Sequence, residues 1–130
     1  MPNAACPFLM FEGNAEAAIN LYVALFSGQV DSMQRYAAGE PGPDGTVKLA
    51  SFTVAGQTIK ATDSFVKHAF SFTPSVSLFV ECESESEIDR LYAALGEGGS
   101  TLMPIDNYGF SRRFAWVNDR FGVSWQLNLS

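Results

Sequence analysis

The chain of 130 residues repeats itself imperfectly at an offset of 69 positions, and this repeat limits the folds that it can adopt. Apolar residues fall on apolar residues at several positions, such as Met10 with Phe79, Tyr22 with Leu91 and Phe26 with Leu95. The identical pairs at this offset include Leu9 with Leu78, Glu12 with Glu81, Glu16 with Glu85, and Ile19 with Ile88. Such a repeat predicts two copies of one supersecondary unit, which bury their apolar faces by pairing.

In the first copy, the pattern predicts one strand, one helix and three further strands. Apolar residues recur every three or four positions over 15–26, which is typical of an amphipathic helix. Asn14 is expected to cap this helix and Gly28 to stop it. Strands are expected at 7–11, 30–36, 46–54 and 57–63, with a loop over 39–45 and a tight turn at Ala55-Gly56.

The second copy shows the same order of elements. Ser84 and Glu87 have the spacing of a capping box, in which hydroxyl and carboxylate each accept a hydrogen bond from an unpaired backbone donor. The helix that follows ends in the glycine-rich segment 96–99. Strands are expected at 75–81, 101–105, 110–117 and 123–128, with a turn over 118–122.

Together the two copies predict an α+β fold and a single domain over 1–130. Its two βαβββ modules span about 7–63 and 74–128, with a linker over 64–73. One helix covers only one face of each sheet, so pairing the modules should leave the helices outside and a concave mixed sheet inside. A concave sheet of this kind predicts a small-molecule cavity.

Composition narrows the class of partner. The net charge is −6 with only 8 Lys and Arg residues, which argues against nucleic acid and anionic membranes as partners. No apolar run approaches the roughly 20 residues that cross a bilayer, and the N-terminus does not read as a signal peptide, so a cytoplasmic protein is expected. Cys6 and Cys82 fit no metal-binding spacing and are expected to be reduced and buried.

Several segments resemble one known family. Residues 8–19 (FLMFEGNAEAAI) and 116–127 (WVNDRFGVSWQL), with shorter matches at 67–74, 103–104 and 107–111, resemble the PhnB-like branch of the vicinal-oxygen-chelate superfamily, which has the glyoxalase, bleomycin-resistance and dioxygenase fold. The resemblance covers nearly the whole chain. Sequences of this branch often carry the label 3-demethylubiquinone 3-methyltransferase. Neither strand-to-helix turn here is glycine-rich, as a site for S-adenosylmethionine commonly is, so methyl transfer is not expected.

The resemblance also implies where a metal would bind. In the superfamily's metalloenzymes, four side chains on the first and last strands of the two modules hold a divalent ion. These places fall near Pro7, on Ala61 or Asp63, on Ser75 and on Gln126. Only Asp63 and Gln126 offer good oxygen donors, and zinc needs at least three protein ligands. We therefore expect no metal and no cofactor, although a weak magnesium site stays open as an alternative.

Four side chains outside the metal positions are further candidates for a site. His68 is either a general base at the cavity mouth or a loop histidine that holds a backbone carbonyl. Tyr108 could donate a hydrogen bond to a ligand or act as an acid. Arg112 and Arg113 are consecutive, so on a strand one would face inward, favour an anionic ligand and pair with Asp63; the alternative is that the chain bends there and both are solvated.

Alternation along the last strand orients its residues. Adjacent strand residues face opposite ways, so Gln126 and Trp125 cannot both point to the cavity. An unpaired amide under the helices would cost about 1–3 kcal/mol, which favours Trp125 on the helix side and Gln126 in the cavity near Asp63.

Three functions fit these features. The favoured one is a metal-independent small-molecule binding protein of the bleomycin-resistance kind, which leaves the ligand and any catalysis open. The second is an enzyme, such as a lyase, isomerase or oxygenase, acting on an oxygenated substrate. The third is an interaction module with a filled cavity. A homodimer is expected in each case, because the unpaired sheet edges need a partner.

Overall fold

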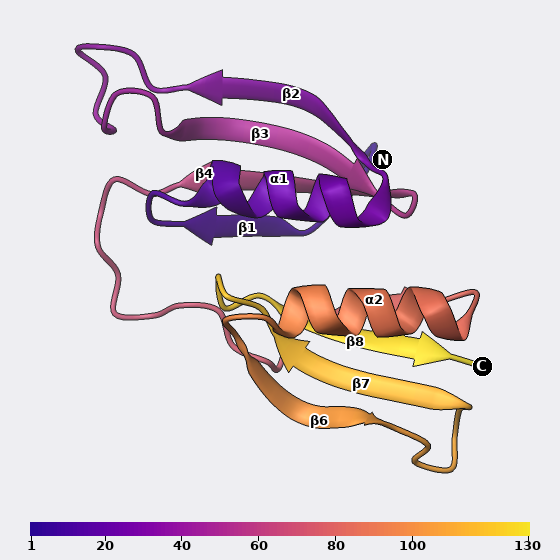
Figure 1. The fold of residues 1–130 in the computed structure, drawn as a ribbon. Helices are drawn as coiled ribbons and strands as arrows, with labels where there is room; N and C mark the ends of the chain where they lie inside the picture. The colour runs from indigo at the N-terminus through magenta and orange to yellow at the C-terminus, as the bar shows by residue number, and fades with distance from the viewer. The chain divides into compact units, whose positions relative to one another are not determined.

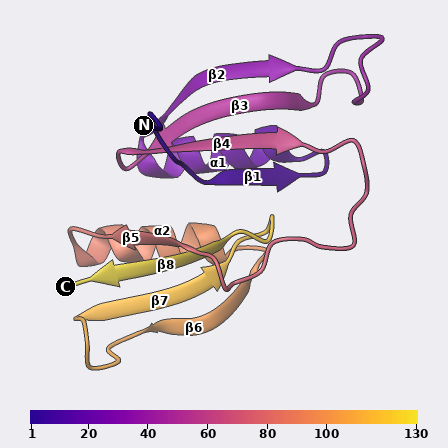
Figure 2. The same ribbon diagram turned by 180° about the vertical axis from the view of Figure 1, so that it is seen from behind.

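The computed structural model describes residues 1–130, which divide into two compact units, Met1–His68 and Ala69–Ser130. Both units have the element order strand, helix, strand, strand, strand. In each unit the helix lies along one face of a four-stranded sheet (Figures 1 and 2). The predicted α+β class with its two βαβββ units is confirmed.

The first unit contains one helix and a mixed sheet in the order β1-β4-β3-β2. β1 pairs with β4 in parallel, and the remaining pairs are antiparallel. Tyr22 of the helix stacks on Phe52 with 6.2 Å between ring centroids, and both side chains are fully buried. Its elements are β1 (Phe8–Phe11), α1 (Ala15–Phe26), β2 (Gln29–Arg35), β3 (Val47–Val54) and β4 (Gln57–Asp63).

The second unit has the same connectivity, with the sheet order β5-β8-β7-β6. β5 pairs with β8 in parallel, so the first and last strands of the unit are neighbours. Ile88, Leu91 and Leu95 form the buried face of the helix. Its elements are β5 (Leu78–Glu81), α2 (Glu85–Gly96), β6 (Ser100–Asp106), β7 (Arg113–Asn118) and β8 (Ser124–Leu129).

Two strands begin three residues later than the sequence predicts. β5 starts at Leu78 rather than Ser75, because the chain turns at Pro74 and Ser75, and the Thr73 and Ser75 hydroxyls lie 2.7 Å apart within this turn. β7 starts at Arg113 rather than residue 110. The Asn107 side-chain oxygen there accepts a hydrogen bond from Gly109 N, and Gly109 adopts φ +97, so the chain turns locally before the strand begins.

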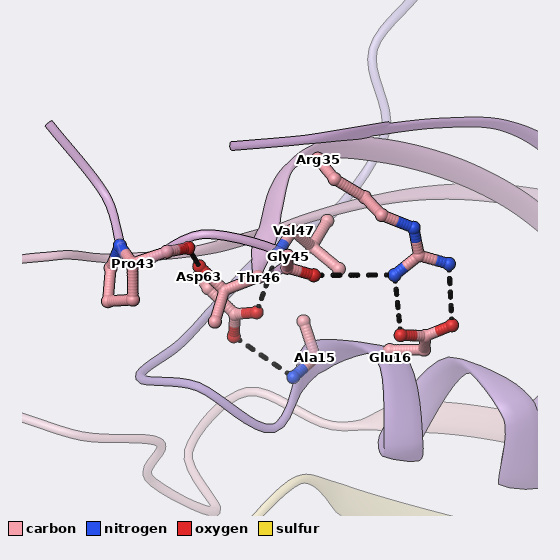
Figure 3. Close-up of polar contacts among 8 residues, drawn as sticks. All are labelled: Ala15, Glu16, Arg35, Pro43, Gly45, Thr46, Val47 and Asp63. Carbon is pink, nitrogen blue, oxygen red and sulfur yellow. Dashed lines mark hydrogen bonds and ion pairs between the residues drawn. The ribbon is translucent and has the colours of Figure 1, made fainter. Parts of the chain in front are cut away.

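The two helices are capped in different ways. The capping box of α2 forms: Ser84 Oγ accepts from Glu87 N at 3.2 Å, while Glu87 Oε1 accepts from the backbone of Glu83 rather than that of Ser84. The prediction that Asn14 caps α1 is wrong, since its side chain makes no cap hydrogen bond. Asp63 at the end of β4 takes this role, as Figure 3 shows.

Gly28 is required for close packing rather than only to end a helix. α1 ends at Phe26, its C-cap Ser27 adopts the left-handed conformation, and Gly28 N donates to Val23 O. A side chain on Gly28 would place its Cβ 2.2 Å from Thr53 O. Gly99, before β6, meets the same restriction, with Asn118 O at 2.0 Å. In each unit, therefore, a glycine allows the helix-to-strand connection to pack closely against the backbone of the sheet.

Neither helix has the length and apolar character that crossing a membrane requires.

The two cysteines differ in environment. Cys82 is buried as expected, but Cys6 is only half-buried. Burial, with a smaller contribution from the nearby Glu87 carboxylate, raises the pKa of the Cys82 thiol to about 11. Since the thiolate is the nucleophile, we expect Cys82 to alkylate roughly a hundredfold more slowly at pH 8 than a thiol of ordinary pKa.

Iodoacetamide followed by intact-mass analysis checks this prediction. One adduct should form quickly, on Cys6, and a second only slowly. In denaturing urea both should form at similar rates, which is the control. Equal rates in the native protein would contradict the protected environment of Cys82.

Candidate functional site

The sheet of the second unit has one face under α2 and one face that the helix does not cover, which we call the open face. The Arg113 guanidinium lies 2.7 Å from Asp89 of α2, so Arg113 marks the helix side. Trp125 and Leu127 are fully buried on the same side, paired with Val117 and Ala115. Alternation places Gln126 and Asn128 on the open face, which is the register that the sequence predicts.

Gln126 is held by a neighbour that the sequence analysis missed. Its Nε2 donates to Ser77 Oγ at 2.9 Å, and the pair is partly buried. Ser77 precedes β5, which runs in parallel beside β8. Ser75, which the resemblance implies as one of the metal positions, lies in the preceding turn and contacts Thr73. The sequence predicts Gln126 near Asp63 and does not identify Ser77 as its partner.

A second polar chain crosses the open face beside this pair. The Asn128 side chain, which is 6% exposed, donates through Nδ2 to Glu81 Oε2 at 3.0 Å and accepts a short hydrogen bond from the Ser111 hydroxyl. The open face thus carries two fixed polar groups, Ser77–Gln126 and Ser111–Asn128–Glu81. Gln126 and Asn128 are successive residues of β8 on this face. Glu81 and Asn128 were not among the predicted site residues.

Aromatic rings surround these polar groups. Phe114 is buried, and three more exposed rings lie around it: Phe110 at 5.0 Å, Tyr108 at 6.2 Å and Phe79 at 6.4 Å between centroids. Phe79 pairs with Gln126 across the sheet, and Trp116 pairs with Gln126 on the other side. The amide of Gln126 is therefore flanked by aromatic residues on both neighbouring strands. The alternation of side chains from residue 77 to 81 could have predicted that Ser77, Phe79 and Glu81 share one face.

Tyr108 belongs to this aromatic group, but its hydroxyl is already engaged. It donates to Pro104 O at 2.5 Å, and the ring stacks on Phe110. The structure thus places a predicted site residue at the open face through its ring, with its hydroxyl turned to the backbone.

One alternative required either Arg112 or Arg113 to face inward and pair with Asp63, and neither side chain does so. Arg113 pairs with Asp89 on the helix side. Arg112 is exposed before β7 and donates through Nε and Nη2 to Ser130 O at 3.1 and 2.9 Å. The chain bends at Arg112, which is exposed as the other alternative held, whereas Arg113 is only partly exposed and is not fully solvated as that alternative required. The predicted pairing of an arginine with Asp63 is wrong for Arg113, whose partner is Asp89.

Asp63 is buried beneath α1 and bound to the backbone. Its Oδ1 accepts from Gly13 N at 2.8 Å and Ala15 N at 3.0 Å, and its Oδ2 accepts from Val47 N at 2.9 Å. Figure 3 shows the carboxylate between the first turn of α1 and the start of β3. Asp63 is 3% exposed, and its carboxylate accepts from three backbone N–H groups, so its role is structural. Asp63 belongs to the first unit and Gln126 to the second, so their predicted proximity stays a prediction.

The salt bridge beside Asp63 ties the 37–46 loop to the helix. Arg35 contacts both oxygens of Glu16, at 2.5 and 2.7 Å, and reaches Gly45 O at 3.4 Å (Figure 3). The hydrogen bond from Arg35, followed by its charge, lowers the pKa of the Glu16 carboxyl. Both side chains are about half exposed, so solvent screens the pair.

His68 lies at the end of the first unit. Its Nε2 and Ser64 Oγ are 2.9 Å apart, and its backbone N–H donates to Glu12 Oε2 at 3.4 Å. One partner of its ring is thus a hydroxyl. Its role as a base stays a prediction.

The strand register corrects the places that we assigned to a metal. Leu9 pairs with Ala61 in the first unit as Leu78 pairs with Trp125 in the second. Thr62 therefore corresponds to Gln126, while Ala61 and Asp63 lie on the helix side. The open side of β1 presents Phe8 and Met10, which offer no oxygen donor. This donor set does not fit the superfamily's divalent ion, and no three His, Cys, Asp or Glu side chains gather elsewhere in the chain.

Comparison with known proteins agrees with this fold. A glyoxylase/bleomycin resistance protein/dioxygenase domain from Frankia is similar over 100% of this chain and 93% of that one, with a TM-score of 0.68 at 15% identity. The chain thus has the vicinal-oxygen-chelate fold. It belongs, over residues 3–128, to the family described as 3-demethylubiquinone-9 3-methyltransferase, within the PhnB-like branch of that superfamily.

Two relatives support the membership over most of the chain. The structure of a PhnB protein from Bacillus cereus is 48% identical, covers 98% of this chain and 100% of its own, and superposes with a TM-score of 0.95. The protein YjdN from Escherichia coli is 24% identical over 95% of this chain and 92% of its own length.

Proposed function

We propose that the protein binds a small organic molecule on the open face of the second sheet, without a metal ion. The observation that carries this proposal is the fixed, partly buried Ser77–Gln126 pair between Phe79 and Trp116. Because Gln126 donates to Ser77, its carbonyl oxygen is positioned to accept a hydrogen bond from a ligand. Aromatic residues around a few fixed polar groups are typical of small-molecule sites.

Methyl transfer, which the family's description names, does not follow from these features. Each strand-to-helix connection is already occupied by its own chain: Asp63 accepts from the backbone before α1, and Ser84 with Glu87 caps α2. A nucleotide-like cofactor commonly uses these backbone donors at the start of a helix. We therefore assign the protein a binding role and name no catalytic residue.

We further propose a cytoplasmic homodimer. The exposed rings of Phe110 and Phe79, at 63% and 55% exposure, also support the alternative that this surface contacts a second copy. The two roles differ in their response to a small ligand, so binding is the measurement that separates them. Sedimentation at about tens of micromolar would test the dimer.

Gln126→Leu should weaken the binding of a hydroxylated aromatic probe. 1-Naphthalenemethanol offers a ring for the aromatic residues and a hydroxyl for the Gln126 carbonyl. We expect its affinity, measured by ligand-observed NMR, to fall about three- to tenfold, since a neutral hydrogen bond contributes about 0.5–1.5 kcal/mol. The free energy of unfolding should change by less than about 1 kcal/mol, because the remaining Ser77 hydroxyl is near solvent.

The matched probe 1-methylnaphthalene lacks the hydroxyl and should bind both proteins equally or favour the leucine variant. Gln57→Leu, the same substitution on the exposed end of β4, is the control variant and should leave both affinities unchanged. Absence of binding by either probe to the native protein would count against the proposed function, as would equal losses for both probes in Gln126→Leu.

A further inference from the structure

We infer that the open face of the second sheet selects aromatic ligands that carry a positive charge. This inference rests on the proposed function and names the chemical class of its ligand. It reverses the expectation of an anionic ligand, which depended on an arginine facing inward.

The first support is the aromatic cluster of Phe79, Tyr108, Phe110 and Phe114. The centroids of the other three rings lie 5.0 to 6.4 Å from that of Phe114, with Phe110 at 70° and Tyr108 at 86° to the Phe114 ring. Such an arrangement presents both ring faces and ring edges on one surface. Ring faces attract a cation that lies within about 6 Å of the centroid, and they stack on a planar ligand equally well.

The second support is the position of two carboxylates beside these rings. Glu81 pairs with Asn128 across β5 and β8, and Asp106 pairs with Phe114 across β6 and β7, so both belong to the open face. One Glu81 oxygen is fixed by Asn128 Nδ2 at 3.0 Å, which orients the carboxylate and leaves its other oxygen to a ligand. Asp106 uses one oxygen to accept from Asn107 N at 2.7 Å. The two acids therefore border the aromatic cluster on opposite edges of the sheet.

The third support is that the arginines of this unit bind other groups or lie on α2. Residues 69–130 contain no lysine and four arginines. Arg113 pairs with Asp89 and Arg112 with Ser130 O, while Arg120 reaches Ala94 O at the end of the helix. The remaining one, Arg90, is on α2 itself. The two acids at the open face thus have no arginine paired with them, and the potential there favours a cationic ligand over an anionic one.

A charge series on one aromatic frame tests this selectivity. The probes are 1-naphthylmethylammonium, 1-naphthalenemethanol and 1-naphthoate, which carry +1, 0 and −1 charge on the same ring system. Affinities are measured by ligand-observed NMR at neutral pH and low ionic strength. We expect the cation to bind about tenfold more tightly than the neutral probe, with the anion weakest. Added salt should reduce this preference.

Glu81→Gln isolates the contribution of one carboxylate. Glutamine keeps an oxygen that can accept from Asn128, so the polar chain is retained while the charge is lost. The preference for the cation over the neutral probe should fall about threefold or more, with the neutral probe unaffected. Glu97→Gln at the end of α2 removes the same charge away from the open face and is the matched control.

The outcomes separate the two proposals. If all three probes bind equally, or if the anion binds best, the charge selectivity is wrong while the binding role stands. If no probe binds, both proposals fail. Equal effects of Glu81→Gln and Glu97→Gln would show that the preference comes from the net charge of the protein rather than from this surface.

Discussion

Asp63→Ala should unfold much of the first unit, with a loss of about 3–5 kcal/mol in its free energy of unfolding. The substitution leaves the backbone N–H groups of Gly13, Ala15 and Val47 without their acceptor. A hydrogen bond to a charged group contributes about 1.5–3 kcal/mol, and an unsatisfied buried donor carries its own desolvation cost. The loss stays below the sum of the three bonds, because water can enter where the carboxylate stood.

Hydrogen exchange localises this effect better than global probes. Both tryptophans, Trp116 and Trp125, lie in the second unit, so their fluorescence does not report on the first. Peptides that cover α1 and β3 should lose protection by roughly a thousandfold if 4 kcal/mol is lost, since each 1.4 kcal/mol is tenfold in an equilibrium constant.

Two further variants give the controls. Asp63→Asn keeps one oxygen acceptor but places an amide donor against a backbone N–H, so it should lose less than alanine does. Asp44→Ala, in the exposed 37–46 loop, removes the same charge and should change stability by less than about 0.5 kcal/mol. Protection of α1 and β3 that stays unchanged in Asp63→Ala would show that the carboxylate does not hold these elements together.

The comparison of Asp63 with Asn14 shows what sequence patterns can and cannot predict. The extent of α1, 15–26, follows from the spacing of its apolar residues, which is local information. The identity of its cap does not, because the Asp63 carboxylate accepts from Ala15 N across 48 positions of sequence. Asn14 has the favoured residue type at the expected place, yet the end of β4 brings a charged acceptor to the same donors.

The site could be predicted only in part, for a similar reason. Alternation along β8 correctly separates Trp125 from Gln126, because side chains on a strand have a strict period of two. Ser75 and Ser77 are two residues apart, so alternation predicts the same face for both and cannot show which one contacts Gln126. The turn at Pro74 removes Ser75 from the strand and leaves Ser77 beside Gln126. The direction of Arg113 depends on Asp89 of a helix, and no pattern within the strand contains that partner.

Asp119→Ala should have the second large effect, a loss of about 3 kcal/mol in the stability of the second unit. This carboxylate, 3% exposed, accepts from Phe121 N at 2.8 Å, Val123 N at 3.1 Å and Trp125 Nε1 at 2.9 Å. It therefore fixes the turn between β7 and β8 and anchors the largest side chain of the core. Because β8 carries Gln126 and Asn128, the same bonds set the register of the proposed site.

A double-mutant cycle with Trp125→Phe measures the buried bond by itself. Phenylalanine fills most of the indole volume but removes the N–H that Asp119 accepts from, so each single variant loses this bond. The summed losses of the two single variants should exceed the loss of the double variant by about 1.5–3 kcal/mol, the range expected for a hydrogen bond to a charged group. Urea unfolding followed by circular dichroism gives the free energies, since Trp125 cannot serve as the probe in its own variant. Additive losses would show that Asp119 acts through the turn alone, and the anchoring of Trp125 would then rest on its packing between β8 and α2.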